Sequence, residues 1–292
     1  WAFRLLYEVT GHYNYTILAS MGILVILLGL VVMAWATRRL IRTMIGVVMP
    51  GESDNLSDLI FSNLQLSKGP KVVVIGGGTG LSVMLRGLKA KTYNLTAVVT
   101  VADDGGSTGR IRQDLDIIAP GDLRNCLVAL ADKEGLMEKL FAHRFGGSGN
   151  LTGHSFGNLF IAALIEVLGD VEEAMDATSK VLRVRGKVIP SSAEKLRLNA
   201  EMTDGRIVEG ESQIPHAHGK IKRVFTTPEH PKAIQSAVDA IKEADAIVLG
   251  PGSLYTSIMP NLCVPDIVQA VRTSKAPKIY ICNVMTQPGE TD

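Results

Sequence analysis

An apolar run followed by a cluster of glycines constrains this chain more than any other feature. Residues 72–75 are short, continuous and mostly β-branched, as buried parallel strands are. Four of the next five residues are glycine: Gly76, Gly77, Gly78 and Gly80. Apolar residues then recur at helical spacing: Leu81, Met84, Leu85 and Leu88. The order strand, glycine turn, helix is therefore predicted for residues 71–88.

This turn has the composition of a phosphate-binding loop. Glycines let a ligand approach the main chain, and a helix start offers unpaired N–H groups and a partial positive charge. We expect the contacts from Gly77, Gly78, Thr79 and Gly80. The strict G-x-G-x-x-G spacing fails, because Leu81 takes the last position counted from Gly76, and no Gly-Lys-Ser/Thr follows. A tight turn without a ligand remains the alternative.

Length, net charge and cysteine content limit what class of protein this is. The 292 residues, 46% hydrophobic, are enough for one large domain or two smaller ones. A net charge of +1 gives no indication of nucleic-acid binding. The cysteines are odd in number and widely spaced, at Cys126, Cys263 and Cys282, which excludes a disulfide framework and fits a reducing compartment.

The N-terminal part contains a candidate membrane anchor. Residues 16–36 carry no charge and are long enough to span a bilayer. Arg38, Arg39 and Arg42 follow, so the positive-inside rule places the C-terminal side in the cytoplasm. A cleaved signal peptide would have its basic cluster before the apolar run. The apolar stretch at 40–49 suggests a separate interfacial helix.

These features predict three parts and a location. We expect a protein of the inner (cytoplasmic) membrane with its globular domain in the cytoplasm. The first residue is not Met and the last follows a strand-like run, so we expect a fragment at both ends. The predicted parts are an anchor at 1–49, a linker at 50–70 and a globular domain at 71–292.

A second polar cluster follows the next predicted strand, residues 95–101. Asp103 and Asp104 then stand where doubly wound folds hold an acidic residue for a ribose hydroxyl. Two adjacent carboxylates could also hold Mg²⁺ through water, and a solvated turn is the alternative. The glycine-rich residues that follow, Gly106 and Ser107 among them, predict a second run of exposed N–H and hydroxyl groups.

Two more clusters each precede a helix. In Pro-Gly-Asp-Leu-Arg-Asn, Asp122 is interpreted as an N-cap, and Arg124 and Asn125 could reach an anion. A glycine-rich loop at 146–153 leads to three polar residues before an apolar helix at 159–168: His154, Ser155 and Asn158. His154 is a candidate acid or base, or else bonds locally. Ser155 is either an N-cap or a phosphate contact.

Residues 181–223 interrupt the strand–helix rhythm with short alternating runs. Asp204-Gly205 between the runs 196–202 and 207–214 predicts a hairpin within a β-rich insertion or lid. His216 and His218 would share one strand face, but the sequence offers no third ligand, so no metal site is predicted there.

The rhythm returns with a helix at 231–244 and a strand at 246–249. A glycine loop then follows a strand for the third time, and its Gly252, Ser253 and Tyr255 are suited to a phosphate or sugar. We call it the third glycine loop. The last strand is predicted at 278–282. We expect every polar cluster to lie at the carboxyl end of a strand, in an α/β, doubly wound, mostly parallel sheet.

Six motifs in order resemble the YvcK-like gluconeogenesis-factor branch of the CofD (2-phospho-L-lactate transferase-like) family. They are VIGGGTG, TVADDGGSTGRIR, PGDLRN, GHSFGNL, GPGSLYTSIMPNL and ICNVMTQPGETD, and they span residues 71–292. The resemblance implies a Rossmann-like core. It also implies binding of a UDP-sugar such as UDP-N-acetylglucosamine, and roles in growth on gluconeogenic carbon sources, cell-wall synthesis and cell shape.

Three functions stay open. The first is a nucleotide-sugar-binding regulator, with possible protein partners or homo-oligomers. The second is a CofD-type phosphotransferase acting on a deazaflavin, with Asp103 or Asp104 holding Mg²⁺ and His154 as a further catalytic candidate. The third is an NAD-binding protein. The pocket implied by the resemblance comprises Gly77, Gly78, Thr79, Asp103, Asp104, Ser107, His154, Asn158, Gly252, Ser253 and Tyr255.

Overall fold

The computed structural model describes residues 4, 7–9, 15–48, 63–132 and 135–291. The chain divides into two compact units, Trp1–Asn63 and Leu64–Asp292. Most of the predicted linker, residues 50–62, lies outside the described part.

The first unit is built on one long helix, α2 (Tyr15–Val48). The predicted interfacial helix at 40–49 is not separate, because α2 continues through that stretch to Val48. Within α2, Ala19–Ile41 has a mean hydropathy of 2.4 and no buried residues. At 1.5 Å per residue, these 23 residues extend about 35 Å, which is long enough to cross a bilayer.

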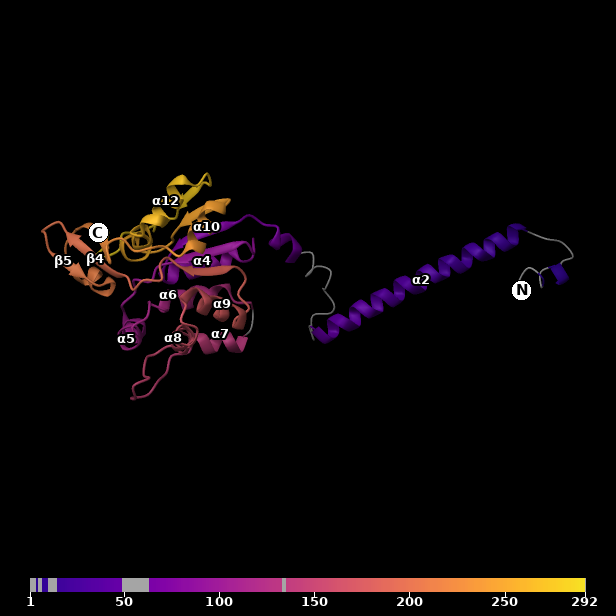
Figure 1. Ribbon diagram of the computed structural model, residues 1–292, viewed down its shortest axis with the longest axis horizontal. Coiled ribbons are helices and arrows are strands. Elements are labelled where there is room, and N and C mark those ends of the chain that lie inside the picture. The colour runs from indigo at the N-terminus through magenta and orange to yellow at the C-terminus, as the bar shows by residue number, and fades with distance from the viewer. Residues whose placement is uncertain (1–3, 5–6, 10–14, 49–62, 133–134, 292) are drawn as a thin grey trace. The chain divides into compact units, whose positions relative to one another are not determined.

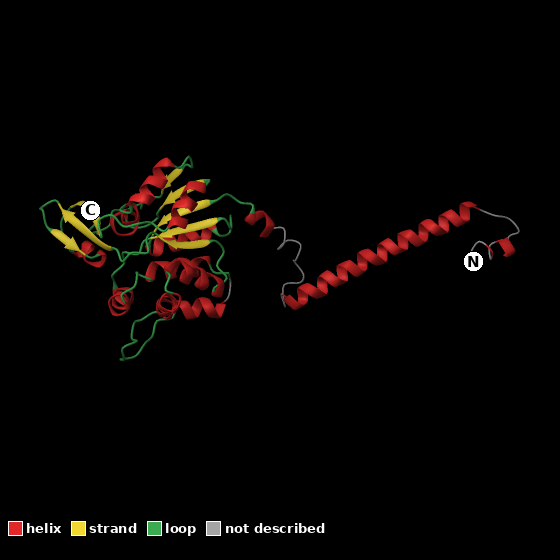
Figure 2. Ribbon diagram, viewed as in Figure 1, coloured by secondary structure: helices red, strands yellow, loops and turns green. Residues whose placement is uncertain are grey.

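The second unit is organised around a five-stranded parallel sheet (Figures 1 and 2). Its strand order is β3-β2-β1-β7-β8, and every neighbouring pair is parallel. The bounds are β1 (Val72–Gly76), β2 (Leu95–Val99), β3 (Lys187–Pro190), β7 (Ala246–Leu249) and β8 (Lys278–Tyr280). The register sets Val73 opposite Thr96 on one side and Ile247 on the other. The predicted α/β, mostly parallel fold is confirmed.

Strand order creates a switch point between β1 and β7. From β1 the chain moves outward through β2 and β3, then returns to the other side of β1 for β7 and β8. Loops that leave the carboxyl ends of β1 and β7 therefore diverge, which opens a crevice in sheets of this kind.

Helices cover both sides of the sheet. In Figure 1, α6, α7, α8 and α9 lie below the strands, and α10 and α12 lie above them. The core between these layers is aliphatic, with Val74, Ile75, Val98 and Leu127 fully buried. The bounds are α4 (Gly78–Leu88), α5 (Gly106–Leu115), α6 (Gly121–Leu130), α7 (Gly135–Ala142), α8 (Phe156–Leu168), α9 (Val171–Val181), α10 (Gln235–Glu243), α11 (Met259–Leu262) and α12 (Pro265–Thr273).

The β-rich insertion is a separate three-stranded antiparallel sheet. Its order is β5-β4-β6, from β4 (Arg197–Met202), β5 (Ile207–Glu209) and β6 (Ile221–Thr227). The predicted hairpin at Asp204-Gly205 is confirmed by the antiparallel β4–β5 pairing. The predicted run to residue 214 is wrong, because a 3₁₀ helix, η2 (Glu211–His216), replaces it. The two histidines consequently share no strand face, since His216 ends η2 and His218 has φ 46°.

Other boundaries also differ from the sequence predictions. Strand β2 ends at Val99, although the buried apolar run continues to Ala102. Strand β3, inside the stretch assigned to the insertion, belongs to the main sheet because it pairs with β2. The glycine-rich segment after Asp104 forms α5, so Ser107 and Thr108 are each 5% exposed and not the exposed hydroxyls expected.

Candidate functional site

The first glycine turn joins β1 to α4 by a close approach of backbone to side chains. A Cβ atom at residue 77 would lie 2.5 Å from Thr100 Cγ2 and 2.6 Å from Asp122 Oδ2, so any other residue would force these two side chains to shift. Gly78 has φ 70°, in the left-handed region that favours glycine. Tight backbone geometry at this point explains the run of glycines after β1.

A cavity of about 330 Å³ lies where the first and third glycine loops meet. The loop after β1 contributes residues 77–80, and the loop after β7 contributes Pro251, Gly252, Ser253 and Ser257. Asn283 and Gln287 close it from the segment after β8. The cavity therefore lies at the β1/β7 switch point, where open α/β sheets bind ligands.

Side-chain hydrogen bonds fix the third glycine loop, which follows β7. Ser253 caps the π-helical turn η3 (Leu254–Ile258), where its Oγ accepts the N–H of Thr256 at 3.3 Å and donates to the Glu290 carboxylate. Asn283 Nδ2 donates to the Gly252 carbonyl at 3.1 Å. Tyr255, expected in the pocket, packs instead against the hydrophobic core and does not line the cavity.

Four carboxylates gather beside this cavity. Asp122, interpreted from sequence as an N-cap, is instead the second residue of α6 and accepts the Gly78 N–H. Burial, reinforced by the nearby Asp103, raises the pKa of Asp122 to about 6. Burial also raises the pKa of Asp103, whose Oδ1 accepts the Gly105 N–H at 2.9 Å. Asp104 Oδ1 accepts the Ser212 N–H at 2.8 Å.

Glu211 is the fourth carboxylate, and it comes from the β-rich insertion. Burial raises its pKa to about 8, and the negative charges of Asp103, Asp122 and Asp104 act in the same direction. The bond from Ser212 to Asp104 fixes this part of the insertion over the carboxylates. Sequence reasoning missed both Glu211 and Asp122 as site residues, because neither stands in a strand–glycine–helix pattern.

His154, Ser107 and Asn158 form a buried hydrogen-bonded cluster. Ser107 Oγ accepts the Ser155 N–H at 3.3 Å and the Asn158 Nδ2 at 3.4 Å. Its own proton is then available to His154 Nδ1, 3.3 Å away. Burial lowers the pKa of His154, and the positive charge of Arg110 acts in the same direction, which favours the neutral ring. His154 is only 7% exposed, and its ring bonds within this cluster.

Arg124 connects that cluster to the carboxylates. Arg124 is 8% exposed, and its guanidinium donates to Ser155 Oγ at 2.7 Å and to Asn125 Oδ1 at 2.6 Å. Asn125 in turn bonds the Asp122 carboxylate. Arg124 therefore points into the protein, between α6 and α8, and not toward an exposed anion. Ser155 is the N-cap residue of α8 by position, but its hydroxyl makes no capping bond and donates to the Phe141 carbonyl at 3.2 Å.

The predicted polar clusters come together in one region, some at the ends of strands and some at the starts of helices. Those after β1, β2 and β7 follow strands, as expected. The clusters at 120–125 and 154–158 lie at the starts of α6 and α8, each of which follows another helix, so the expectation that all follow strands is wrong for these two. Residues 77–80, 252 and 253 line the cavity, whereas Asp103, Asp104, Gly106, Ser107, Arg124, Asn125, His154, Ser155 and Asn158 lie outside its lining.

The family model described as 2-phospho-L-lactate transferase CofD matches residues 72–292. The chain belongs to the CofD family. The resemblance predicted from the six motifs is thereby confirmed. Within the described residues, no three His, Cys, Asp or Glu side chains are placed to hold a metal ion. A magnesium ion would therefore need ligand oxygens in addition to one or two of these carboxylates.

Relatives within the CofD family carry the name gluconeogenesis factor. A putative gluconeogenesis factor from a Nostoc species is 55% identical over 270 residues, 92% of this chain and 59% of that protein. The gluconeogenesis factor of Bacillus subtilis is 58% identical over 222 residues, 76% of this chain and 70% of that protein. A crystal structure of a Bacillus halodurans protein superposes with a TM-score of 0.75 at 57% identity, covering 77% of this chain and 72% of that one.

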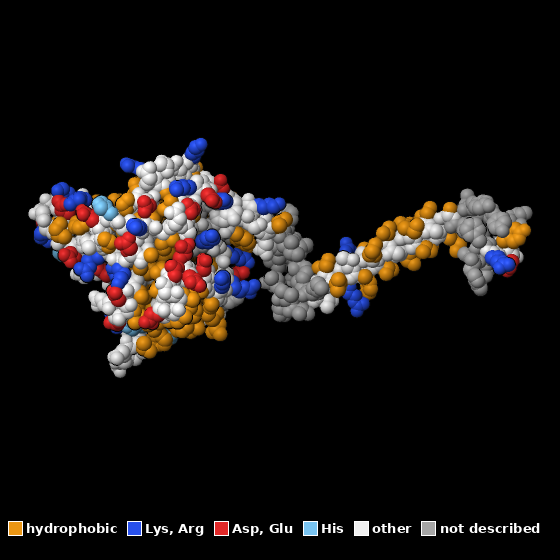
Figure 3. Space-filling view, viewed as in Figure 1, with side chains coloured by type: hydrophobic (Ala, Val, Ile, Leu, Met, Phe, Trp, Pro, Cys, Tyr) orange, Lys and Arg blue, Asp and Glu red, His pale blue; other side chains and the backbone are white. Residues whose placement is uncertain are grey.

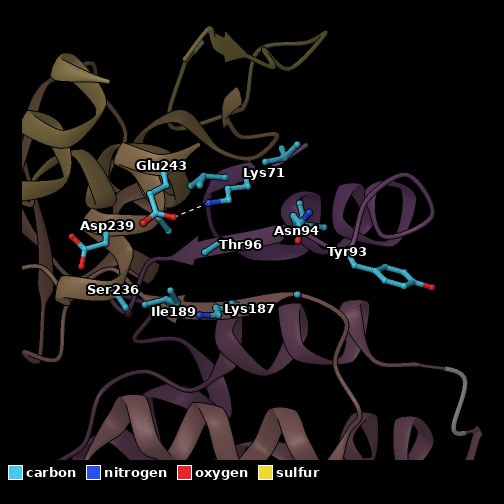
Figure 4. Close-up of a pocket in the computed structure, with 14 residues that line it drawn as sticks. Lys71, Tyr93, Asn94, Thr96, Lys187, Ile189, Ser236, Asp239 and Glu243 are labelled. Carbon is cyan, nitrogen blue, oxygen red and sulfur yellow. Dashed lines mark hydrogen bonds and ion pairs between the residues drawn. The ribbon is translucent and has the colours of Figure 1, made fainter. Parts of the chain in front are cut away.

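A second, larger cavity of about 490 Å³ lies at the opposite, amino ends of β1, β2 and β3 (Figure 4). Helix α10 forms its other wall. At its edge, Lys71 Nζ pairs with Glu243 at 2.8 Å. The lining of this cavity contains no residue of the six motifs.

Proposed function

We propose that this protein is a membrane-anchored nucleotide-sugar-binding regulator of carbon metabolism, cell-wall synthesis and cell shape, with a UDP-N-acetylglucosamine-like ligand. The observation that carries the proposal is the cavity between the β1 and β7 loops. Its lining is mostly main chain and small polar side chains, which suits a diphosphate approached by backbone N–H groups. The gluconeogenesis factors among its relatives support the regulatory role.

The anchor part of the proposal rests on composition and on one relative. Ala19–Ile41 is long and apolar enough to cross a bilayer, and Arg38, Arg39 and Arg42 favour a cytoplasmic C-terminal side. The 270-residue match to the Nostoc protein is longer than the Leu64–Asp292 unit, so it includes part of the N-terminal unit. Cell fractionation with protease protection of the intact chain tests this placement.

A CofD-type phosphotransferase is the second candidate, favoured by the four carboxylates beside the cavity. Mg²⁺ binds one or two carboxylates together with substrate phosphates, and it would neutralise charge that develops on a transferring phosphoryl group. Asp103 and Asp104 are the residues that would hold it. Asp122 would keep the glycine turn in place through the Gly78 N–H.

Calorimetric titration of the intact chain separates these functions. UDP-N-acetylglucosamine, NAD and GDP are each titrated with and without Mg²⁺. Tight, metal-independent uptake of the UDP-sugar without turnover is the expected result. Product formation that requires Mg²⁺ and is lost in Asp104→Asn would establish the transferase instead, and preferential uptake of NAD would overturn both.

A further inference from the structure

One side of helix α8 is apolar and uncovered. Between Phe156 and Leu168 the helix has a single charged residue, Glu166. Its inner side is buried in the core through Ile161, Ala162 and Ile165. The opposite side is a stripe at spacings of three and four that is half-buried or exposed: Phe160, Ala163, Leu164 and Val167. A helix that is hydrophobic all round is normally covered all round.

Helix α7 extends this apolar surface. Leu136 is 80% exposed and Leu140, one turn later, is 37% exposed. The Phe141 ring packs edge-on against Phe156 and Phe160, with centroid distances of 5.8 and 4.9 Å, which fixes α7 beside α8. Figure 3 shows the hydrophobic side chains gathered over these helices. We call this surface the α7–α8 face: Leu136, Leu140, Phe160, Ala163, Leu164 and Val167.

Charges at the two ends of α8 have opposite signs. At its N-terminal end, the Phe156 N–H donates to the His143 carbonyl at 3.0 Å, which brings the exposed Arg144, the next residue in the chain, close to that end. At its C-terminal end lie the exposed Glu166 and Asp170. The face is therefore apolar along its length, basic at one end and acidic at the other.

We propose that the α7–α8 face joins two copies of this chain about a twofold axis, with the two α8 helices antiparallel. A twofold axis perpendicular to α8 reverses the helix direction, so the basic end of each helix meets the acidic end of the other. An anionic lipid surface would attract one sign of charge only. The pairing of opposite ends therefore favours a second copy over a membrane as the occupant.

The size of the face sets the expected strength. Helix α8 has 13 residues and so extends about 20 Å, which is short for a standard protein interface. We therefore expect reversible dimers that form in the micromolar range, reinforced where a shared bilayer concentrates the chains.

Cysteine cross-linking of the intact chain in membranes tests the geometry. In an isologous interface a residue near the axis meets its own copy. Ala163→Cys in a Cys282→Ser background, which removes an exposed cysteine, should form a covalent dimer on mild oxidation. Gln269→Cys, exposed on α12, should yield less than a tenth as much. Equal yields from both positions would overturn the proposal.

Sedimentation of the intact chain in detergent tests the energetics. Leu136→Ser with Val167→Ser should weaken self-association at least tenfold, because both side chains are about 80% exposed and their loss leaves the core intact. Val83→Ser changes a valine on α4 that is 64% exposed, and it should leave self-association unchanged. Both variants keep α2, so any self-association through that helix is the same in each. Circular dichroism checks folding. Unchanged association in the double variant, or loss of vesicle binding instead, would refute the dimer.

Discussion

The two ends of the parallel sheet each carry a cavity, and the smaller one has the features of a nucleotide site. The amino-end cavity has about 490 Å³ and the carboxyl-end cavity about 330 Å³. At the amino end three polar side chains have partners: Lys71 pairs with Glu243, Asn94 Nδ2 donates to the Gly69 carbonyl at 2.7 Å, and Asp239 accepts from Gln235 at 2.8 Å. The Ser236 hydroxyl in the same lining is buried and has no hydrogen-bond partner among the described residues.

The carboxyl-end cavity differs in what lines it. Two glycine loops present main chain there, and the loops diverge because the strand order reverses between β1 and β7. Volume alone would select the amino end. The proposed nucleotide site therefore rests on the glycine loops and their place at the switch point, and not on the amount of empty space.

The largest effect is expected from filling the carboxyl-end cavity. Gly78→Val should weaken UDP-N-acetylglucosamine binding more than about 100-fold, because valine is strained at φ 70° and its branches occupy the approach to the main chain. Gly87→Val in the same helix meets no atom within 4 Å and has no positive φ, so its affinity should stay near that of the native protein. Calorimetry measures both.

A substitution in the amino-end cavity tests whether that cavity contributes to nucleotide-sugar binding. Ala240→Leu projects a larger side chain into the amino-end cavity from α10. Nucleotide-sugar affinity should change less than threefold in this variant. A loss as large as that of Gly78→Val would reverse the assignment of the two ends.

A smaller effect on stability is expected from the buried cluster behind the site. Ser107→Ala leaves the Ser155 N–H and the Asn158 amide without their common acceptor, which should lower the free energy of unfolding by about 2 kcal/mol. Ser67→Ala, which removes an exposed hydroxyl bonded to the Leu64 carbonyl, should have little effect in the same urea titrations. Equal losses would show that the cluster has no special role.

The carboxylates predict a pH dependence of similar size. The pKa of Glu211 rises from 4.5 to about 8 on folding, so the folded protein holds a proton that the unfolded chain releases. The resulting stabilisation is fully present below about pH 4.5 and is lost as the pH rises through 8. Native protein should therefore lose on the order of a few kcal/mol more than Glu211→Gln between pH 5 and pH 9.

Urea titrations at several pH values give this measurement. Glu229→Gln, exposed beyond β6, is the matched control and should follow the native pH profile. If Glu211→Gln also followed that profile, the buried carboxylate would not be the source of the dependence.

The smallest effect is expected at the amino end. Lys71→Met removes an ion pair whose two side chains are 56% and 66% exposed. Solvent screens such pairs, so the urea midpoint should not shift measurably. A clear loss of stability would give the amino end a greater role than its exposure suggests.

Local patterns were sufficient for much of the fold. The β-branched run at 72–75 and the apolar run after Tyr93 became the paired strands β1 and β2. Asp204-Gly205 became a hairpin turn. These predictions succeeded because periodicity and turn chemistry depend on neighbouring residues. They failed at β3 and η2, where pairing with β2 and docking of Ser212 on Asp104 involve distant partners.

The family, the parallel α/β class, the apolar helix and the glycine turns could all be predicted from the sequence, since the motifs behind them are contiguous segments. Three other features depend on long-range packing: two of the three glycine loops share a cavity, Tyr255 packs against the core, and Arg124 points inward. The same packing brings Glu211, 108 residues beyond Asp103, beside Asp122. Strand order and long-range burial set these arrangements, and neither is written in the spacing of neighbouring residues.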